Sequence, residues 1–136
     1  VINMARPRAK ELTERELEIM HIFWDRGEST AADIRDAMET QGRELAYTTV
    51  ATLVRILLDK QFLTQTGFER PFRFIPARTY EEVSRSLLGD LVQKVFGGSR
   101  TRLLVQLLEE EKLTPQEKQR LRTILNTQGD KQKTGK

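Results

Sequence analysis

The sequence has no cysteine, a single histidine and no long hydrophobic run. The lack of cysteine excludes disulfides, thiolate metal sites and thiol redox sensing. One histidine is a poor basis for a metal site within one chain, and we expect neither a metal nor another cofactor. No window approaches the roughly 18 apolar residues of a membrane span, and no signal-peptide pattern opens the chain, so we predict a cytoplasmic protein without membrane contact.

Features typical of an active site are also scarce. The sequence has no Gly-rich phosphate loop, no cysteine nucleophile and no evident orienting partner for His21, so an enzyme is the weakest functional hypothesis. We predict no catalytic residue. His21 is interpreted as a partly buried structural side chain beside an apolar helical stripe.

The net charge of +3 is unevenly distributed along the 136 residues. Residues 1–10 carry bases and no acid, residues 11–40 hold three bases and nine acids, and residues 41–76 hold five bases and three acids. Residues 77–136 hold twelve bases and eight acids. Contacts with nucleic acid are therefore expected from the N-terminal arm and from residues 41–76.

The most informative stretch is residues 46–63, which we predict to be one helix. Its apolar positions recur at helical spacing and indicate a buried face, formed by Val50, Leu53, Val54, Leu57 and Leu58. The opposite stripe is polar and consists of Thr48, Thr52, Arg55 and Asp59. Threonine can hydrogen-bond a phosphate or a base edge and offers a methyl group to thymine. By itself this pattern fits a DNA-reading helix and an amphipathic core helix equally well.

Two helices are predicted before this stretch. Thr13 and Glu16 are spaced as a capping box, and the helix they open should end at Gly27. Thr30 and Asp33 repeat the same spacing and open a second helix that runs to about residue 40. A short Gly-containing turn at residues 41–43 then leads to the third helix, an order typical of a helix-turn-helix.

A β-hairpin wing is predicted at residues 64–75, where two β-rich runs flank a Gly-containing turn. Arg70 and Arg73 lie near its tip and on its second strand, where they could reach phosphates. The alternative is a pair of solvent-exposed arginines on an edge hairpin. Pro76 is expected to close the hairpin and to mark a domain boundary.

Three further helices are predicted at residues 81–96, 101–110 and from 115 onward. They are too short to form a core alone, yet they are rich in Leu and Val, so we predict a homodimer. The expected interface consists of Val83, Leu87, Leu91, Val95, Leu103, Leu104, Leu107, Leu108, Leu121 and Leu125. Packing against the N-terminal half of the same chain is the alternative.

The predicted fold is therefore mainly α with a small β-hairpin wing, in which a winged helix-turn-helix precedes a three-helix dimerisation tail. We assign residues 1–10 to a basic flexible arm and residues 11–76 to the DNA-binding domain. Residues 77–127 form the dimerisation domain, and residues 128–136 form a disordered tail.

In this order of elements, several short motifs resemble the penicillinase-repressor family, the BlaI/MecI group of winged-helix transcriptional repressors. The motifs are residues 12–20 with Trp24, residues 45–50 continuing through Leu53 and Arg55 to Lys60, the wing residues Arg70, Phe72 and Phe74, and residues 94–98 and 113–126. The resemblance covers about residues 11–127, and its combination of motifs is specific although each motif alone is weak.

This resemblance implies a homodimeric repressor that binds double-stranded DNA at a palindromic promoter operator, with targets of the antibiotic-resistance type. By position, Tyr47 opens the base-reading segment, and Thr48, Thr49 and Thr52 lie in it. Arg55 is on the same helix and is included among the DNA-binding residues. Lys60, Arg70 and Arg73 are predicted as phosphate contacts on geometric grounds. The alternative function is a winged-helix module that binds a protein partner without sequence-specific DNA binding.

Two departures from the family pattern concern its control. Members of the β-lactam-resistance branch are cleaved by a regulatory protease at an Asn-Phe bond, whereas the matching position here is Gln106-Leu107. The copper-responsive branch binds metal through tail cysteines, which this chain lacks. The inducing signal is therefore open at this point, including a small molecule bound between tail and wing.

Overall fold

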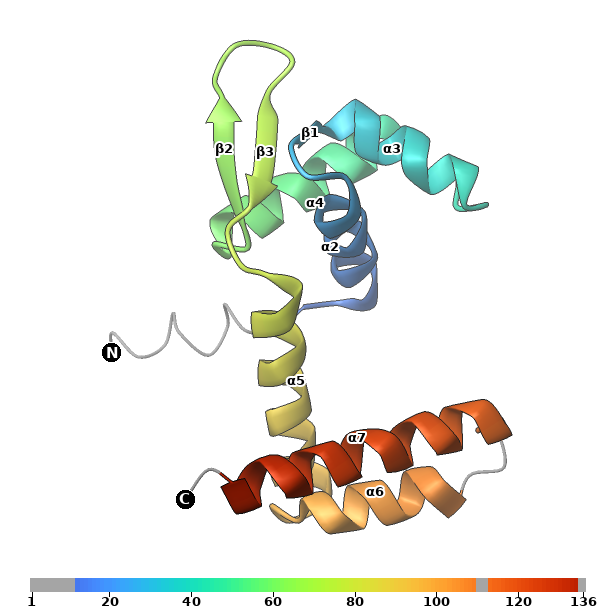
Figure 1. Ribbon diagram of the computed structural model, residues 1–136. Coiled ribbons are helices and arrows are strands. Elements are labelled where there is room, and N and C mark those ends of the chain that lie inside the picture. The colour runs from blue at the N-terminus through green and yellow to red at the C-terminus, as the bar shows by residue number, and fades with distance from the viewer. Residues whose placement is uncertain (1–11, 110–112, 135–136) are drawn as a thin grey trace. The chain divides into compact units, whose positions relative to one another are not determined.

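The structure is a computed structural model that describes residues 12–109 and 113–134. In chain order the elements of these residues are α2 (Glu14–Arg26), β1 (Ser29–Thr30), α3 (Ala31–Thr40), α4 (Tyr47–Asp59), β2 (Leu63–Gly67), β3 (Arg73–Pro76), α5 (Tyr80–Val95), α6 (Arg100–Glu109) and α7 (Pro115–Thr134) (Figure 1). The predicted fold class, mainly α with a small β wing, is confirmed. The predicted arm at residues 1–10 lies outside the described residues.

The chain divides into two compact units, residues 1–87 and residues 88–136, and the division between them falls within the sequence of α5. The first unit contains α2 to α4 and the three strands, and the second contains α6 and α7. The assignment of a DNA-binding domain ending at residue 76 and a dimerisation domain at residues 77–127 stays a prediction. No helix within the described residues combines the length and apolarity that a bilayer crossing requires.

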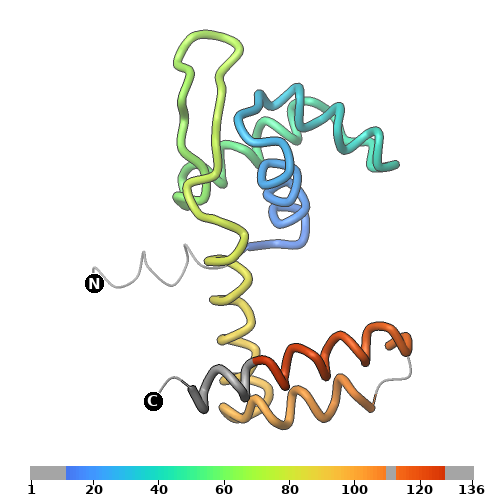
Figure 2. The backbone as a smooth tube through the Cα atoms, in the orientation of Figure 1, coloured from blue at the N-terminus to red at the C-terminus, as the bar shows by residue number. Residues whose placement is uncertain are grey.

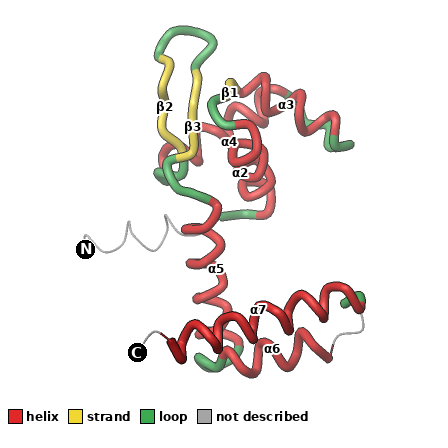
Figure 3. The backbone as a smooth tube through the Cα atoms, viewed as in Figure 1, coloured by secondary structure: helices red, strands yellow, loops and turns green. Residues whose placement is uncertain are grey.

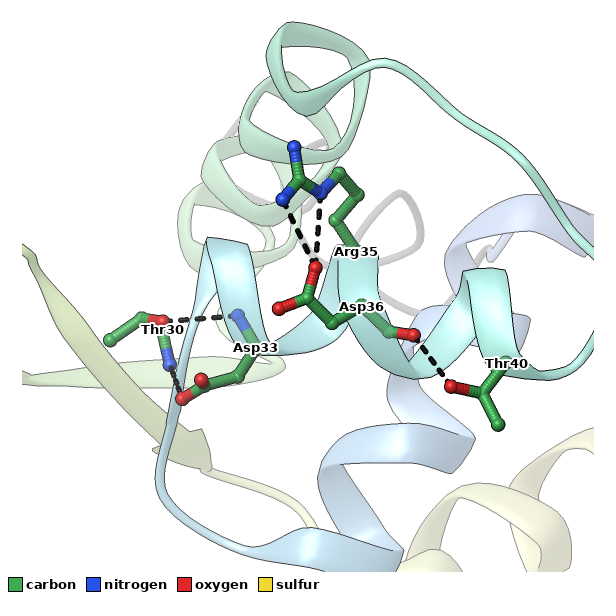
Figure 4. Close-up of polar contacts among 5 residues, drawn as sticks. All are labelled: Thr30, Asp33, Arg35, Asp36 and Thr40. Carbon is green, nitrogen blue, oxygen red and sulfur yellow. Dashed lines mark hydrogen bonds and ion pairs between the residues drawn. The ribbon is translucent and has the colours of Figure 1, made fainter.

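Capping boxes begin both helices that precede α4. The Thr13 N–H donates to Glu16 Oε1 at 3.0 Å, and the Glu16 N–H donates to Thr13 Oγ1 at 3.1 Å. At the start of α3, the Thr30 N–H donates to Asp33 Oδ2 at 3.0 Å and the Asp33 N–H to Thr30 Oγ1 at 3.1 Å (Figure 4). Both predicted helix starts are therefore confirmed. Each capping box stabilises its helix, because it satisfies two backbone N–H groups that would otherwise lack a hydrogen-bond partner.

The core of the first unit lies where α2, α3 and α4 meet the base of the hairpin. Its fully buried side chains include Ile19, Met20, Phe23, Ile34, Met38, Val50, Val54, Leu57 and Phe62. On α4, Val50, Val54 and Leu57 are buried, and Leu53 and Leu58 pack against the same core. The predicted inward stripe of this helix is therefore confirmed. Burial of each such side chain contributes about 1.5–3 kcal/mol.

The sheet has three antiparallel strands in the order β1-β3-β2 (Figure 3). The predicted hairpin is confirmed as β2 and β3, with Thr64 opposite Ile75 and an irregularity between Gln65 and Gly67. The short strand β1, in which Ser29 pairs with Phe74, was not predicted. Two residues are too few to show an alternating pattern, so only the folded chain reveals this strand.

The predicted recognition helix at residues 46–63 is too long at its C-terminal end. The structure ends α4 at Asp59 and starts β2 at Leu63. Gln61 has a φ of 70°, which breaks the helix, and it allows Phe62 to enter the core. The hairpin therefore begins one residue before its predicted start at residue 64, and its second strand includes Pro76. Figure 2 shows the path of the backbone through this hairpin.

The first turns of α5 belong to the core of the first unit. Val83 is 6% exposed within this core, and Leu87 packs against it. The inclusion of Val83 in a dimer interface was wrong, because its side chain is already covered by the N-terminal half of the same chain. Leu87 is only partly buried, so its place in an interface stays a prediction. The alternative given by the sequence, packing against that half, is correct for this part of α5.

The prediction that His21 is partly buried was also wrong, since its side chain is exposed. Its ring contacts Trp24 edge-on at a centroid distance of 5.3 Å and lies 5.9 Å from the Tyr80 ring. The Trp24 Nε1–H donates to the Arg78 carbonyl at 2.9 Å. This aromatic group joins α2 to the start of α5, so the structural role of His21 rests on ring contacts rather than on burial.

The end of the chain differs from the sequence-based expectation as well. Residues 128–136 were predicted to be a disordered tail, whereas the backbone of α7 is helical to Thr134 and residues 135–136 lie outside the described residues. The predicted start of this helix at residue 115 is confirmed, and a capping box opens it, in which the Thr114 N–H donates to Glu117 Oε1 at 3.0 Å. A glycine costs about 1 kcal/mol in a helix interior, so Gly129 weakens this helix without ending it.

The pKa of the Asp33 carboxyl lies below its ordinary value of 3.8, chiefly because the backbone N–H of Thr30 donates to it. Burial opposes this shift, whereas the Thr30 hydroxyl and the charges of Arg26 and Arg73 add to it. A lowered pKa in the folded state means that ionised Asp33 stabilises the fold above pH 3.8. That contribution is lost as the pH falls through the folded-state pKa.

We therefore expect Asp33→Asn to lower the free energy of unfolding by about 0.5–1 kcal/mol near neutral pH, with a deficit that shrinks below pH 3.8. Urea unfolding at about pH 7 and about pH 3 measures both values. Asp36→Asn is the matched control, because Asp36 is exposed on the same helix and its carboxylate pairs with the neighbouring Arg35 (Figure 4). A deficit of equal size for Asp33→Asn at both pH values contradicts this account.

Candidate nucleic-acid interface

The outward face of α4 presents the polar residues that the sequence singled out. Thr48, Thr52, Arg55 and Asp59 are exposed, and Thr49 is partly exposed. Tyr47, the first residue of the helix, is 47% exposed. Asp59 is at the last position of the helix, so the N-terminal half of this face carries hydroxyl groups and no carboxylate.

The N-terminus of α4 differs from the other helix starts in the described part of the chain. Its N-cap is Ala46, which makes no side-chain cap hydrogen bond, and its first turn has no acidic residue. By contrast, α2, α3, α5 and α7 each begin with a Thr and Glu or Asp capping box, and Ser99 caps α6. The first N–H groups of α4 are therefore open to an external acceptor such as a phosphate.

The hairpin places further cationic and aromatic side chains on the same unit. Arg70 and Arg73 are exposed, and the Arg70 guanidinium lies over the Phe72 ring at 5.4 Å from its centroid. Phe68, in the loop between β2 and β3, is 74% exposed. The exposure of Phe68 and Phe72 was not predicted from the sequence. Alternation of apolar and polar residues in a hairpin does not show which of its two faces packs against the rest of the fold.

A cleft of about 730 Å³ separates α4 from the hairpin, with the start of α3 at one side. From the predicted DNA-binding set, it brings together Tyr47 and Arg55 of α4 and Arg70 of the hairpin. Thr48, Thr49 and Thr52 lie outside its lining, beside Arg55 on the outward face of α4. The predicted residues thus form two adjacent surfaces, a hydroxyl-rich helix face and an arginine-flanked cleft.

Lys60 has a different environment from the other predicted phosphate contacts. Its Nζ lies 2.8 Å from Glu16 Oε1, and the exposed fractions of the two side chains are 26% for Lys60 and 4% for Glu16. The Glu16 carboxylate therefore bonds both the Thr13 N–H at the start of α2 and the ammonium at the end of α4. This pair links the two helices. The sequence did not reveal this role, because it indicated Glu16 only as part of a capping box.

Arg73 also has an intramolecular role. Its positive charge contributes to the lowered pKa of Asp33, after the larger effect of the Thr30 N–H. Its Cβ lies close to Gly67 on the neighbouring strand, where a Cβ at residue 67 would approach to 3.2 Å. The assignment of Arg73 to phosphate binding stays a prediction.

The second unit exposes much of its apolar surface. Among the predicted interface residues, Leu91, Val95, Leu107, Leu108 and Leu125 are 41–63% exposed, and Leu103, Leu104 and Leu121 are partly buried. Between Leu88 and Thr127, Val92 is the one buried side chain in the part that the structure describes. Gln106 and Leu107, which match the cleavage position of the β-lactam-resistance branch without its Asn-Phe sequence, are both exposed on α6.

Together, three helices, a two-stranded wing and an exposed helix face define a winged helix-turn-helix protein, a class that binds nucleic acid through its third helix and wing. The chain belongs to the penicillinase repressor family, whose family model, described as "Penicillinase repressor", matches residues 12–127.

Curated relatives agree with this family. The chain is 26% identical over 116 residues to the methicillin resistance regulatory protein MecI of Mammaliicoccus sciuri, covering 85% of this chain and 94% of that protein. It is 33% identical over 100 residues to the transcriptional regulator BlaI of Mycobacterium tuberculosis, covering 72% of each chain. It is 24% identical over 117 residues to the penicillinase repressor of Staphylococcus aureus, covering 85% of this chain and 91% of that protein.

We expect Lys60→Met to lower the free energy of unfolding by about 2–3 kcal/mol, because it leaves the buried Glu16 carboxylate without its cationic partner. Arg35→Met removes an exposed ion pair, with 40% and 63% exposed side chains, and should cost at most about 0.5 kcal/mol. Urea unfolding of both variants measures the difference. Equal losses contradict a structural role for the Lys60 and Glu16 pair.

Proposed function

We propose that this chain is a dimeric transcriptional repressor that places α4 of each subunit in the major groove of a palindromic promoter operator. The observation that carries the proposal is the outward face of α4, which is rich in threonine and begins at a helix start without a side-chain cap. Family membership supports it. The names of the relatives, which include a methicillin resistance regulator, favour target genes of the resistance type.

The two features of α4 divide the work of recognition. Open N–H groups in the first turn suit a phosphate oxygen and fix the position of the helix without reading sequence. Thr49 and Thr52 lie further along, where their hydroxyl and methyl groups can contact base edges. Asp59, at the C-terminal end, stays away from the phosphates if the helix enters the groove with its N-terminus first.

The wing supplies contacts that do not depend on sequence. Arg70 is exposed on the hairpin, on the opposite side of the cleft from Arg55, so one DNA strand can lie near both guanidinium groups. Such contacts release counterions, and affinity should therefore fall steeply as the salt concentration rises. Lys60 is assigned to the support of α4 and not to the phosphates, because its ammonium bonds Glu16.

Dimerisation is proposed for the second unit. Apolar side chains of α5, α6 and α7 are exposed, and a second copy of the same surface is the simplest cover for them. A two-fold dimer would present two copies of α4 to half-sites about one helical turn apart. The interface is assigned to Leu91, Val95, Leu103, Leu104, Leu107, Leu108, Leu121 and Leu125.

The function is tested by selection from a library of random duplexes, with wild-type protein and with Thr52→Ala. We expect the wild type to recover an inverted repeat, and Thr52→Ala to lower the ratio of operator to random-DNA affinity about tenfold. Thr101→Ala, on the exposed side of α6, is the control and should keep this ratio. The base-reading role of Thr52 is wrong if its variant retains the wild-type ratio. A wild-type protein that binds no duplex at low salt instead indicates a protein-binding module.

The dimer is tested by Leu108→Glu and sedimentation analysis. Leu108 is 45% exposed, so the substitution should leave each chain folded but place a charge in the apolar interface. We expect the dimer dissociation constant to rise at least tenfold. Gln106→Glu adds the same charge at a polar exposed position and should have little effect. Equal association of both variants rules out this surface as the interface.

A further inference from the structure

We propose that the cleft between α4 and the hairpin binds a small aromatic anion, which competes with DNA. The proposal rests on the proposed function, since it makes the cleft a regulatory site within the DNA-binding surface. Its volume, about 730 Å³, falls within the range of about 300–1,000 Å³ that is typical of small-molecule sites.

The inner wall of the cleft is apolar and comes from several elements. Ala51, Val54 and Leu58 contribute from α4, and Phe74 from β3. Val54 and Phe74 are buried in the core, so this wall has a fixed shape. Ala51 has a small side chain, which leaves room beside the helix for a flat ring.

Aromatic side chains border this wall on two sides. Tyr47, at the start of α4, is 47% exposed, and Phe72, in the hairpin, is 38% exposed. Both line the cleft. Two partly exposed rings at one site are suited to offset or edge-on contacts with an aromatic ligand, and such contacts contribute beyond the buried area.

The charge of the lining selects an anion. Arg55 and Arg70 lie on opposite elements of the cleft, and none of its described lining residues is acidic. Within the described residues, neither arginine forms an ion pair with a carboxylate. The Arg70 guanidinium is held over the Phe72 ring, which orients it without neutralising it. A guanidinium binds a carboxylate, as it binds a phosphate, with two parallel hydrogen bonds.

An apolar wall with two arginines fits an aromatic carboxylate better than it fits a DNA backbone alone. A sugar-phosphate strand can use the arginines but offers no ring to the wall formed by Ala51, Leu58 and Phe74. A bound aromatic carboxylate would occupy Arg55 and Arg70, which DNA also needs under the proposed function. Ligand and DNA should therefore exclude each other.

The test uses 2-naphthoate as the probe, and the uncharged 2-naphthalenemethanol as its matched analogue. Calorimetry with the full chain, without DNA, should show naphthoate binding at least tenfold tighter than the alcohol. Phe72→Ala and Arg70→Gln should each weaken naphthoate binding at least tenfold. Phe68→Ala removes an aromatic ring from the same hairpin outside the cleft and should leave naphthoate affinity within about twofold of wild type.

Fluorescence anisotropy of labelled duplex then measures competition. The inference is supported if the protein binds DNA without naphthoate and releases it as naphthoate is added. The apparent dissociation constant for DNA should then rise in proportion to the naphthoate concentration. The inference is overturned if naphthoate does not bind, or if it binds without releasing DNA. It is also overturned if the alcohol binds as tightly as naphthoate, or if Phe72→Ala binds naphthoate as tightly as the wild type does. Absence of DNA binding before naphthoate is added contradicts the proposed function instead, so the two failures are distinguishable.

Discussion

The architecture of the first unit depends on the burial of one stripe of α4. Val50, Val54 and Leu57 are at most 2% exposed, and their contacts with α2, α3 and the hairpin fix the rotation of the helix about its axis. Because a helix has 3.6 residues per turn, this burial directs Thr48, Thr52 and Arg55 outward. The same residues that stabilise the fold therefore determine which side chains can meet DNA.

Polar interactions complete this arrangement in two opposite ways. Most helix starts are closed by capping boxes, and the Lys60 and Glu16 pair holds the end of α4 against the start of α2. The start of α4 has no side-chain cap, so it keeps its N–H groups open. The start of α4 lacks the stabilisation that a side-chain cap provides, which is consistent with the binding of an external anion at this helix end. The cleft beside it adds two arginines on an apolar wall.

Features that depend on nearby residues could be predicted from the sequence. The capping boxes, the inward stripe of α4 and the hairpin each follow from spacings of a few residues, and all three are present. Contacts between distant residues could not be predicted. The partners Lys60 and Glu16 are 44 residues apart, β1 needs β3 to exist as a strand, and the burial of Val83 depends on a core built by earlier helices. The cleft was missed for the same reason, because its walls come from separate elements.

The central claim is that the exposed face of α4 lies in the major groove. Dimethyl sulfate protection tests it most directly, since guanine N7 lies in the major groove and adenine N3 in the minor groove. On a duplex recovered by selection, bound protein should protect guanine N7 in two patches about one helical turn apart. Binding that leaves every guanine N7 reactive, or that protects adenine N3 alone, would contradict the claim.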